Sequence, residues 1–128
     1  MTRKVYTIGY SRRSIEELSQ IADTLDAVIF DIRHSPWSRR PEFRKKHLAK
    51  VLGRQYQHVP DLGNVNYRSG GDIKIANLDS GQALIEASER PVILMCACFD
   101  SRICHRTTIA NHLRSEGFSV EELTDVEE

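Results

Sequence analysis

The chain has 128 residues, with 18 Lys and Arg against 18 Asp and Glu, so its formal net charge is zero. Its length predicts a single globular domain over residues 1–128. Its zero net charge excludes the class of strongly basic or strongly acidic proteins, which are drawn to their partners by overall charge. No apolar run approaches the roughly 18 residues of a membrane span, and no signal peptide is recognisable. Three cysteines, an odd number, favour free thiols in a reducing cytoplasm over a disulfide framework.

Charge is distributed unevenly along the chain. Residues 1–58 contain 12 Lys and Arg and 6 Asp and Glu, whereas residues 59–128 contain 6 and 12. The basic excess is densest between Arg33 and Arg54. It offers a surface to a phosphate-bearing small molecule or to nucleic acid, although a solvated helix face explains the same pattern.

Strand and helix signals alternate along the sequence. Apolar runs predict strands at 4–8, 27–32, 56–59 and 92–96, with a fifth at 119–123. Helical periodicity predicts helices at about 14–25, 41–52, 79–88 and 104–116. Residues 60–76, rich in Gly, Asn and Asp, form a long loop. This order predicts a three-layer α/β domain in which a mostly parallel sheet of four to five strands is flanked by helices.

Helix ends carry recognisable signals. Ser14 and Glu17 have the spacing of a capping box at the start of the first helix. Pro41 suits the first position of the second helix, because its missing N–H is unpaired there in any case. Asp79, with Gln82 three positions later, predicts a cap for the third helix.

Polar and reactive residues follow the predicted strands. Because crossovers between parallel strands are right-handed, the carboxyl ends of all strands lie at one edge of the sheet. The segments that would meet there are 9–11, 31–33, 60–61 and 96–106. In α/β proteins this edge is where ligands usually bind, so the sequence predicts a functional site there.

Four motifs follow the strands in order: Thr7-Ile-Gly-Tyr-Ser11, then Asp31-Ile-Arg33 with Ser38-Arg-Arg-Pro-Glu-Phe43, then His58-Val-Pro-Asp-Leu-Gly63, then Cys96-Ala with Cys104-His-Arg106. With these motifs the chain resembles the domain of unknown function 488 family over nearly its whole length. The resemblance implies a small cytoplasmic α/β domain and carries no established reaction. Two positions depart from the family pattern, since Tyr10 stands for a histidine and Cys98 for a glutamate.

Cys104 lies at the start of the predicted fourth helix. Unpaired N–H groups and the helix dipole favour an anion there, and the adjacent His105 and Arg106 strengthen the effect. The thiolate, which is the nucleophilic form, should therefore be available near neutral pH. A small buried residue and a metal ligand remain alternative roles for Cys104.

We therefore expect a cysteine-dependent enzyme acting on a small anionic or nucleotide-like substrate. Cys104 would be the nucleophile, His105 a proton-transfer group and Arg106 an anion binder. Asp31 would orient one of these groups or pair with Arg33 or Arg106 in a salt bridge. The residues expected to border or bind the substrate are Tyr10, Ser11, Arg33, Arg39 and Asp61.

Two other functions stay open at this point. Trp37 and the basic segment after it suit a nucleic-acid-binding module with structural cysteines. Cys96, Cys98, Cys104 and His105 supply the number of ligands that a structural zinc site takes, although their spacing is poor for chelation. We assign no residue to a metal, and the sequence identifies no cofactor.

Overall fold

The computed structural model describes residues 4–66, 72–97 and 105–123. Five strands, four α-helices and three short 3-10 helices follow one another along this part of the chain. The strands are β1 (Lys4–Gly9), β2 (Val28–Asp31), β3 (Tyr56–His58), β4 (Val92–Cys96) and β5 (Ser119–Glu122). The helices are α1 (Ile15–Leu25), α2 (Lys45–Leu52), α3 (Leu78–Ala87) and α4 (His105–Ser115). The 3-10 helices are Pro41–Phe43, Gly53–Gln55 and Pro60–Leu62.

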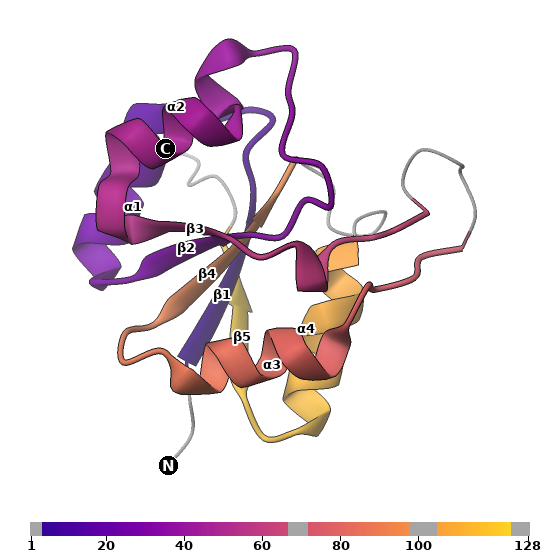
Figure 1. The fold of residues 1–128 in the computed structure, drawn as a ribbon. Helices are drawn as coiled ribbons and strands as arrows, with labels where there is room; N and C mark the ends of the chain where they lie inside the picture. The colour runs from indigo at the N-terminus through magenta and orange to yellow at the C-terminus, as the bar shows by residue number, and fades with distance from the viewer. Residues whose placement is uncertain (1–3, 67–71, 98–104, 124–128) are drawn as a thin grey trace.

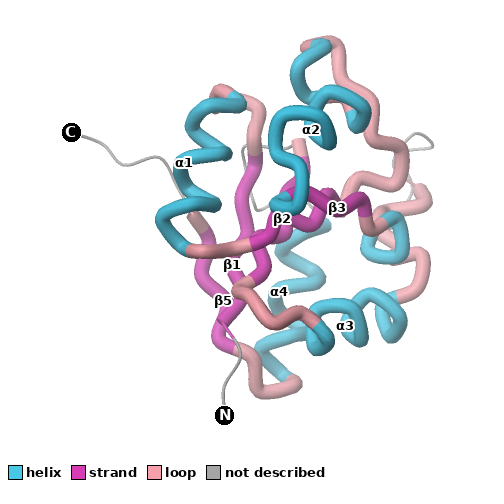
Figure 2. The backbone as a smooth tube through the Cα atoms, turned by 60° about the vertical axis from the view of Figure 1, so that its left-hand side comes forward, coloured by secondary structure: helices cyan, strands magenta, loops and turns pink. Residues whose placement is uncertain are grey.

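All five strands are parallel and form one sheet in the order β3-β2-β4-β1-β5. Helices α1 and α2 cover one face of this sheet, and α3 and α4 cover the other (Figures 1 and 2). The predicted three-layer α/β architecture is confirmed, and the fifth strand is present. No helix in the described part of the chain is long and apolar enough to cross a membrane.

The central strand β4 has both faces buried, which explains its unbroken apolar sequence. Side chains alternate between faces along a strand. Val92 and Leu94 accordingly join the core beneath α3 and α4, while Ile93 and Met95 join the core beneath α1 and α2. Cys96, the last residue of β4, belongs to the core on the α3 and α4 face.

The predicted capping box of α1 is confirmed. Ser14 Oγ accepts a hydrogen bond from the Glu17 N–H at 3.1 Å, and the Glu17 carboxylate accepts from the Ser14 N–H at 2.9 Å. The cap of α3 was predicted at the wrong residue. Asn77 is the cap and accepts from the Ser80 N–H at 3.1 Å, which places Asp79 inside the first turn.

The prediction of one continuous helix over 41–52 was also wrong. A 3-10 turn ends at Phe43, Arg44 is extended (φ −81°, ψ 149°), and α2 starts at Lys45. The reason is a tertiary hydrogen bond, because the Lys45 N–H donates to the Pro36 carbonyl at 3.2 Å rather than to a carbonyl of the preceding turn. The segment 36–38 is thereby held against the start of α2.

The long loop predicted at 60–76 is partly ordered where it is described. Residues Pro60–Leu62 form a 3-10 turn, and Asn64 pairs with Ile75 in an isolated antiparallel bridge. Asp61 anchors this region, since its side chain accepts from the Ser80 hydroxyl at 2.6 Å and its carbonyl from the Asn77 N–H at 2.8 Å.

Candidate functional site

The carboxyl ends of β1, β2 and β4 form a rim at one edge of the sheet. The chain leaves β1 and β2 through helices on one face and leaves β4 through a helix on the other (Figure 1). Such a reversal of direction opens a crevice at the strand ends, which is where ligands bind in open parallel sheets. Backbone hydrogen bonds continue at the rim beyond the ends of the strands. Tyr10 N–H donates to the Cys96 carbonyl at 3.0 Å, and Ile32 N–H to the Met95 carbonyl at 3.0 Å.

On the α1 and α2 face, four polar side chains of the rim form what we call the Asp31 cluster: Asp31, Arg33, Tyr10 and Tyr56. Arg33 clamps the Asp31 carboxylate with Nε and Nη2, at 2.8 and 2.6 Å. Its Nη1 donates to the Tyr10 hydroxyl at 3.1 Å. The Arg33 N–H and the Tyr56 hydroxyl complete the set, donating to Asp31 at 3.2 and 2.6 Å.

The Asp31 cluster is a closed ionic network. Four donors occupy the two oxygens of Asp31, which is about what a carboxylate can accept. Burial alone would lower the pKa of Arg33, but its hydrogen bonds to Asp31 and the charge of that carboxylate raise it above the usual range. Burial, followed by the charge of Asp31, also raises the pKa of Tyr56, which therefore stays protonated. The Asp31 carboxylate is thus fully engaged by donors from within the protein.

Tyr10 is fixed from two sides in this network. Its ring stacks on Phe43 with centroids 4.3 Å apart and planes 5° from parallel, and the Arg33 guanidinium lies 5.3 Å from the ring centroid. Only 3% of Tyr10 is exposed. The predicted substrate-border residue is therefore part of the packed support of the rim.

On the α3 and α4 face, a second group forms the Cys96 cluster: Cys96, Arg106, Glu122 and Thr7. Arg106 is completely buried, and its Nη1 donates to Cys96 Sγ at 3.1 Å. Its Nε and Nη2 donate to the two carboxylate oxygens of Glu122, at 3.1 and 2.8 Å. The Thr7 hydroxyl also donates to Glu122, because the parallel register sets these two residues side by side on β1 and β5.

Cys96 is disulfide-bonded. The chain has two other cysteines, Cys98 and Cys104, and both lie outside the described residues. The expectation of free thiols is therefore wrong at Cys96. It rested on the number of cysteines and on the presumed compartment, and it gave no weight to their closeness in the sequence, where the three cysteines fall within the nine positions 96–104.

His105 is the first residue of α4, and its side chain reaches the backbone just beyond the end of β2. Its Nε2 lies 2.9 Å from the Ile32 carbonyl. A carbonyl only accepts, so Nε2 carries the proton and Nδ1 is the basic nitrogen of the neutral ring. Burial lowers the pKa of His105, and the positive charge of Arg106 adds to the effect, although the bond to Ile32 opposes it. His105 is thus neutral near pH 7.

The remaining predicted site residues are not brought together. Ser11 and Arg39 are exposed, and Asp61 anchors α3 as described above. The arginines near the rim have separate partners, since Arg33 holds Asp31, Arg106 holds Glu122, and Arg40 donates to the Arg13 carbonyl at 2.7 Å. Cys104 and Arg102 lie outside the described residues.

Three residues of the two clusters were missed in the sequence: Thr7, Tyr56 and Glu122. Thr7 carried a usable signal, because a threonine in the middle of a buried apolar strand needs a hydrogen-bond partner. Glu122 lies in an acidic segment of the kind that is usually exposed to solvent. Tyr56 stood in a strand too short to show which way its side chains point.

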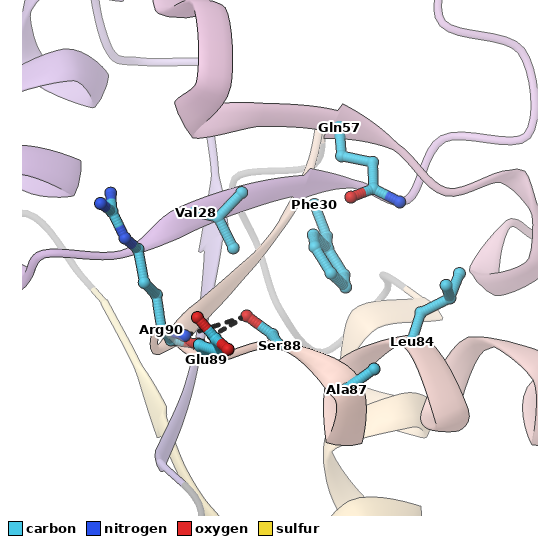
Figure 3. Close-up of a pocket in the computed structure, with 8 residues that line it drawn as sticks. All are labelled: Val28, Phe30, Gln57, Leu84, Ala87, Ser88, Glu89 and Arg90. Atoms are coloured by element: carbon cyan, nitrogen blue, oxygen red, sulfur yellow. Dashed lines mark hydrogen bonds between the residues drawn. The ribbon is translucent and has the colours of Figure 1, made fainter.

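An open hollow of about 370 Å³ lies away from the rim, on the α3 and α4 face (Figure 3). It is bordered by β2, β3 and the end of α3, and its lining residues are Val28, Phe30, Gln57, Leu84, Ala87, Ser88, Glu89 and Arg90. Four of these eight residues are apolar and four are polar or charged. Within the described residues, no group of three or more His, Cys, Asp or Glu side chains is placed to hold a metal ion.

Residues 13–70 match the family model described as Domain of unknown function DUF488. This segment contains the Asp31 and Ser38–Phe43 motifs and ends before the cysteines. No curated protein and no solved structure matches the chain.

Proposed function

We propose that this chain, of which residues 13–70 match the DUF488 family model, is a cysteine-dependent enzyme that performs thiol–disulfide exchange on a small anionic substrate at the rim of its sheet. The single observation that carries the proposal is the Cys96 cluster. A buried guanidinium donates to a sulfur that is already disulfide-bonded. When that disulfide is reduced, Arg106 stabilises the negative charge on the sulfur released.

Cys96 is suited to the second step of such a reaction rather than the first. Only 1% of it is exposed, so a substrate in solution cannot reach its sulfur directly. The attacking thiol must therefore be another cysteine, and the sequence assigns that role to Cys104, next to His105. Neutral His105 can accept the thiol proton on Nδ1.

The proposed reaction starts from the reduced protein. The Cys104 thiolate attacks one sulfur of a substrate disulfide, which forms a mixed disulfide and releases one substrate thiolate. The Cys96 thiolate then attacks Cys104 Sγ, which forms the internal disulfide and releases the second substrate thiolate. The substrate disulfide gains two electrons and the protein dithiol loses two. A second dithiol then reduces the protein by the reverse exchange.

The preference for an anionic substrate rests on the exposed positive charge of the segment that follows β2. Arg39 is exposed in the segment after β2, within the basic stretch between Arg33 and Arg54. Arginine forms strong paired hydrogen bonds with carboxylate and phosphate groups. We therefore nominate a small peptide disulfide that carries free carboxylates as the substrate class.

The test is to trap the mixed disulfide. The reduced protein and its single Cys→Ser variants are mixed with a small carboxylate-bearing disulfide, quenched in acid and weighed by mass spectrometry. The wild type should lose the mass of two hydrogens without an adduct. Cys96→Ser should retain one half of the substrate as a stable adduct, because the second step is removed. Cys104→Ser should do neither, and Cys98→Ser is the matched control that should behave as the wild type.

Two results would reject the proposal. One is a Cys96→Ser variant that turns over the disulfide at the rate of the wild type. The other is a wild-type protein whose Cys96 stays reduced in excess small disulfide, read by alkylation after unfolding.

A further inference from the structure

Trp37 is exposed on the surface of the protein and is not part of its hydrophobic core. It is 57% exposed, the highest value among the exposed large hydrophobic residues in the described part of the chain. The Arg44 guanidinium lies 4.9 Å from the ring centroid, and Arg44 Nε is anchored on the Ser38 carbonyl at 2.8 Å. One face of the indole is therefore supported by a fixed cation, and the side chain is held in place at the start of α2.

The helix beside Trp37 presents positive charge to solvent. Leu48 and Leu52 are its buried residues, and Lys45, Lys46 and Lys50 are exposed around the rest of it. The helix contains no acidic residue. Lysines in a first turn oppose the helix dipole, so the stability of the fold does not account for this arrangement.

We propose that Trp37 and the exposed lysines of α2 bind single-stranded nucleic acid. We call this surface the Trp37 surface, and it consists of Trp37, Lys45, Lys46 and Lys50. A base would stack on the indole face opposite Arg44, and the phosphates that follow would lie along the lysines, which is how proteins hold single strands without reading their sequence. The surface is separate from the buried cysteine, so this inference does not depend on the proposed thiol chemistry.

The exposed indole distinguishes a single strand from other polyanions. An acidic polypeptide would pair with the lysines and gain nothing from a flat aromatic surface. A duplex keeps its bases stacked within the helix and unavailable to Trp37. The combination of one fixed aromatic ring with a row of cations therefore favours unpaired bases on a phosphate backbone.

The chain offers a direct optical readout, because Trp37 is its single tryptophan. The full-length protein, kept reduced, is titrated with a short oligothymidine while tryptophan fluorescence is followed at several salt concentrations. We expect saturable quenching and an affinity that falls steeply as salt rises. Polyglutamate and a duplex of the same length are the comparison ligands, and both should quench weakly.

Matched variants test which side chains carry the binding, with a labelled oligothymidine read by anisotropy. Trp37→Ala should weaken binding by about 5- to 150-fold, the range expected for loss of one stacked base. Lys46→Gln and Lys50→Gln should each reduce the slope of log affinity against log salt by about 0.7. Lys74→Gln, at an exposed lysine outside the Trp37 surface, is the control and should change neither value.

The inference is overturned if quenching is absent, if Trp37→Ala binds as the wild type does, or if polyglutamate binds and quenches equally well. Should Trp37→Ala fail to fold, Trp37→Phe replaces it and must bind more weakly than the wild type. Repeating the titration with Cys96→Ser separates the two proposals. That variant loses the internal disulfide and should keep its affinity for the oligonucleotide.

Discussion

The rim carries two arginine–carboxylate pairs on opposite faces of one sheet, each with a buried arginine, and they differ in what else the arginine touches. In the Asp31 cluster, the guanidinium of Arg33 binds a carboxylate and a phenol, neither of which is oxidised or reduced by thiol–disulfide exchange. In the Cys96 cluster, the guanidinium of Arg106 binds a carboxylate and a sulfur. A sulfur is neutral in a disulfide and negative as a thiolate.

This difference separates a structural pair from a responsive one. The energy of the Asp31 cluster should be the same whatever the redox state of the protein, because none of its members is oxidised or reduced. The energy of the Cys96 cluster should depend on that state, because Arg106 gains a charged acceptor when the disulfide opens. The two arginine–carboxylate pairs therefore differ in whether their energy should depend on the redox state of a cysteine.

The largest expected effect is that of Asp31→Asn. The change leaves the Arg33 guanidinium buried without its counter-charge, and breaking a buried ion pair in this way costs about 3–5 kcal/mol of the free energy of unfolding. Urea denaturation with and without a reductant measures it. The loss should be equal in both conditions, and a loss that depends on the reductant would erase the distinction between the two clusters.

Arg106→Met should cost somewhat less, about 3 kcal/mol, because the Glu122 side chain left behind is 27% exposed and water can solvate it. The variant should also move the dithiol–disulfide equilibrium of Cys96 toward the disulfide. Loss of a hydrogen bond to a charged sulfur, about 1.5–3 kcal/mol, corresponds to a shift of about 10- to 150-fold. Equilibration in a dithiol buffer, quenched by alkylation, gives the value. Asp31→Asn is the control and should not shift it.

The pH dependence of stability tests the environment of His105. Its pKa in the folded protein lies below the ordinary value of 6.5, so the unfolded chain takes up this proton first as the pH falls. The free energy of unfolding should therefore be insensitive to this group above pH 6.5 and decrease below it. Each unit by which the folded pKa is lowered contributes about 1.4 kcal/mol to the decrease.

His105→Gln isolates this contribution, since a glutamine amide can still donate to the Ile32 carbonyl and does not titrate. The variant should lose stability less steeply than the wild type on going below pH 6.5, measured as urea midpoints. His47→Gln, at an exposed histidine of α2, is the matched control. A His105→Gln profile parallel to that of the wild type would show that folding does not lower the pKa of the histidine.

The fold was predictable because its signals are local. The apolar run at 92–96 defines the central strand, and Ser14 with Glu17 defines the start of α1. The errors arose where a distant residue decides the outcome. Arg44 interrupts the second helix because Lys45 donates to Pro36, and Asn77 caps α3 from a position that Asp61 holds in place. Nothing in the neighbouring sequence records either contact.

The position of the site was predictable from the crossover rule, but the choice of partners was not. Asp31 had two arginines as candidate partners, and the structure pairs it with Arg33 on the α1 and α2 face. Arg106 takes Glu122 instead, because β5 lies beside β1 in parallel register and brings that carboxylate to the opposite face. Which side chains become neighbours depends on the strand order, and the sequence of no single strand determines the order of the five parallel strands.

Tyr10→Phe should have the smallest effect and gives the finest test of the comparison. The substitution removes one hydroxyl that accepts from Arg33 at 3.1 Å and preserves the ring that stacks on Phe43. A hydrogen bond of this kind contributes about 1–2 kcal/mol, and the loss should stand near the lower end because Arg33 keeps both of its bonds to Asp31.

Urea denaturation of Tyr10→Phe, Asp31→Asn and the double variant closes a mutant cycle. If the Asp31 cluster is one closed network, removing the hydroxyl should cost less once the carboxylate is gone, since Arg33 is then no longer held against Tyr10. Strict additivity would mean that the Tyr10 hydroxyl contributes independently of Asp31.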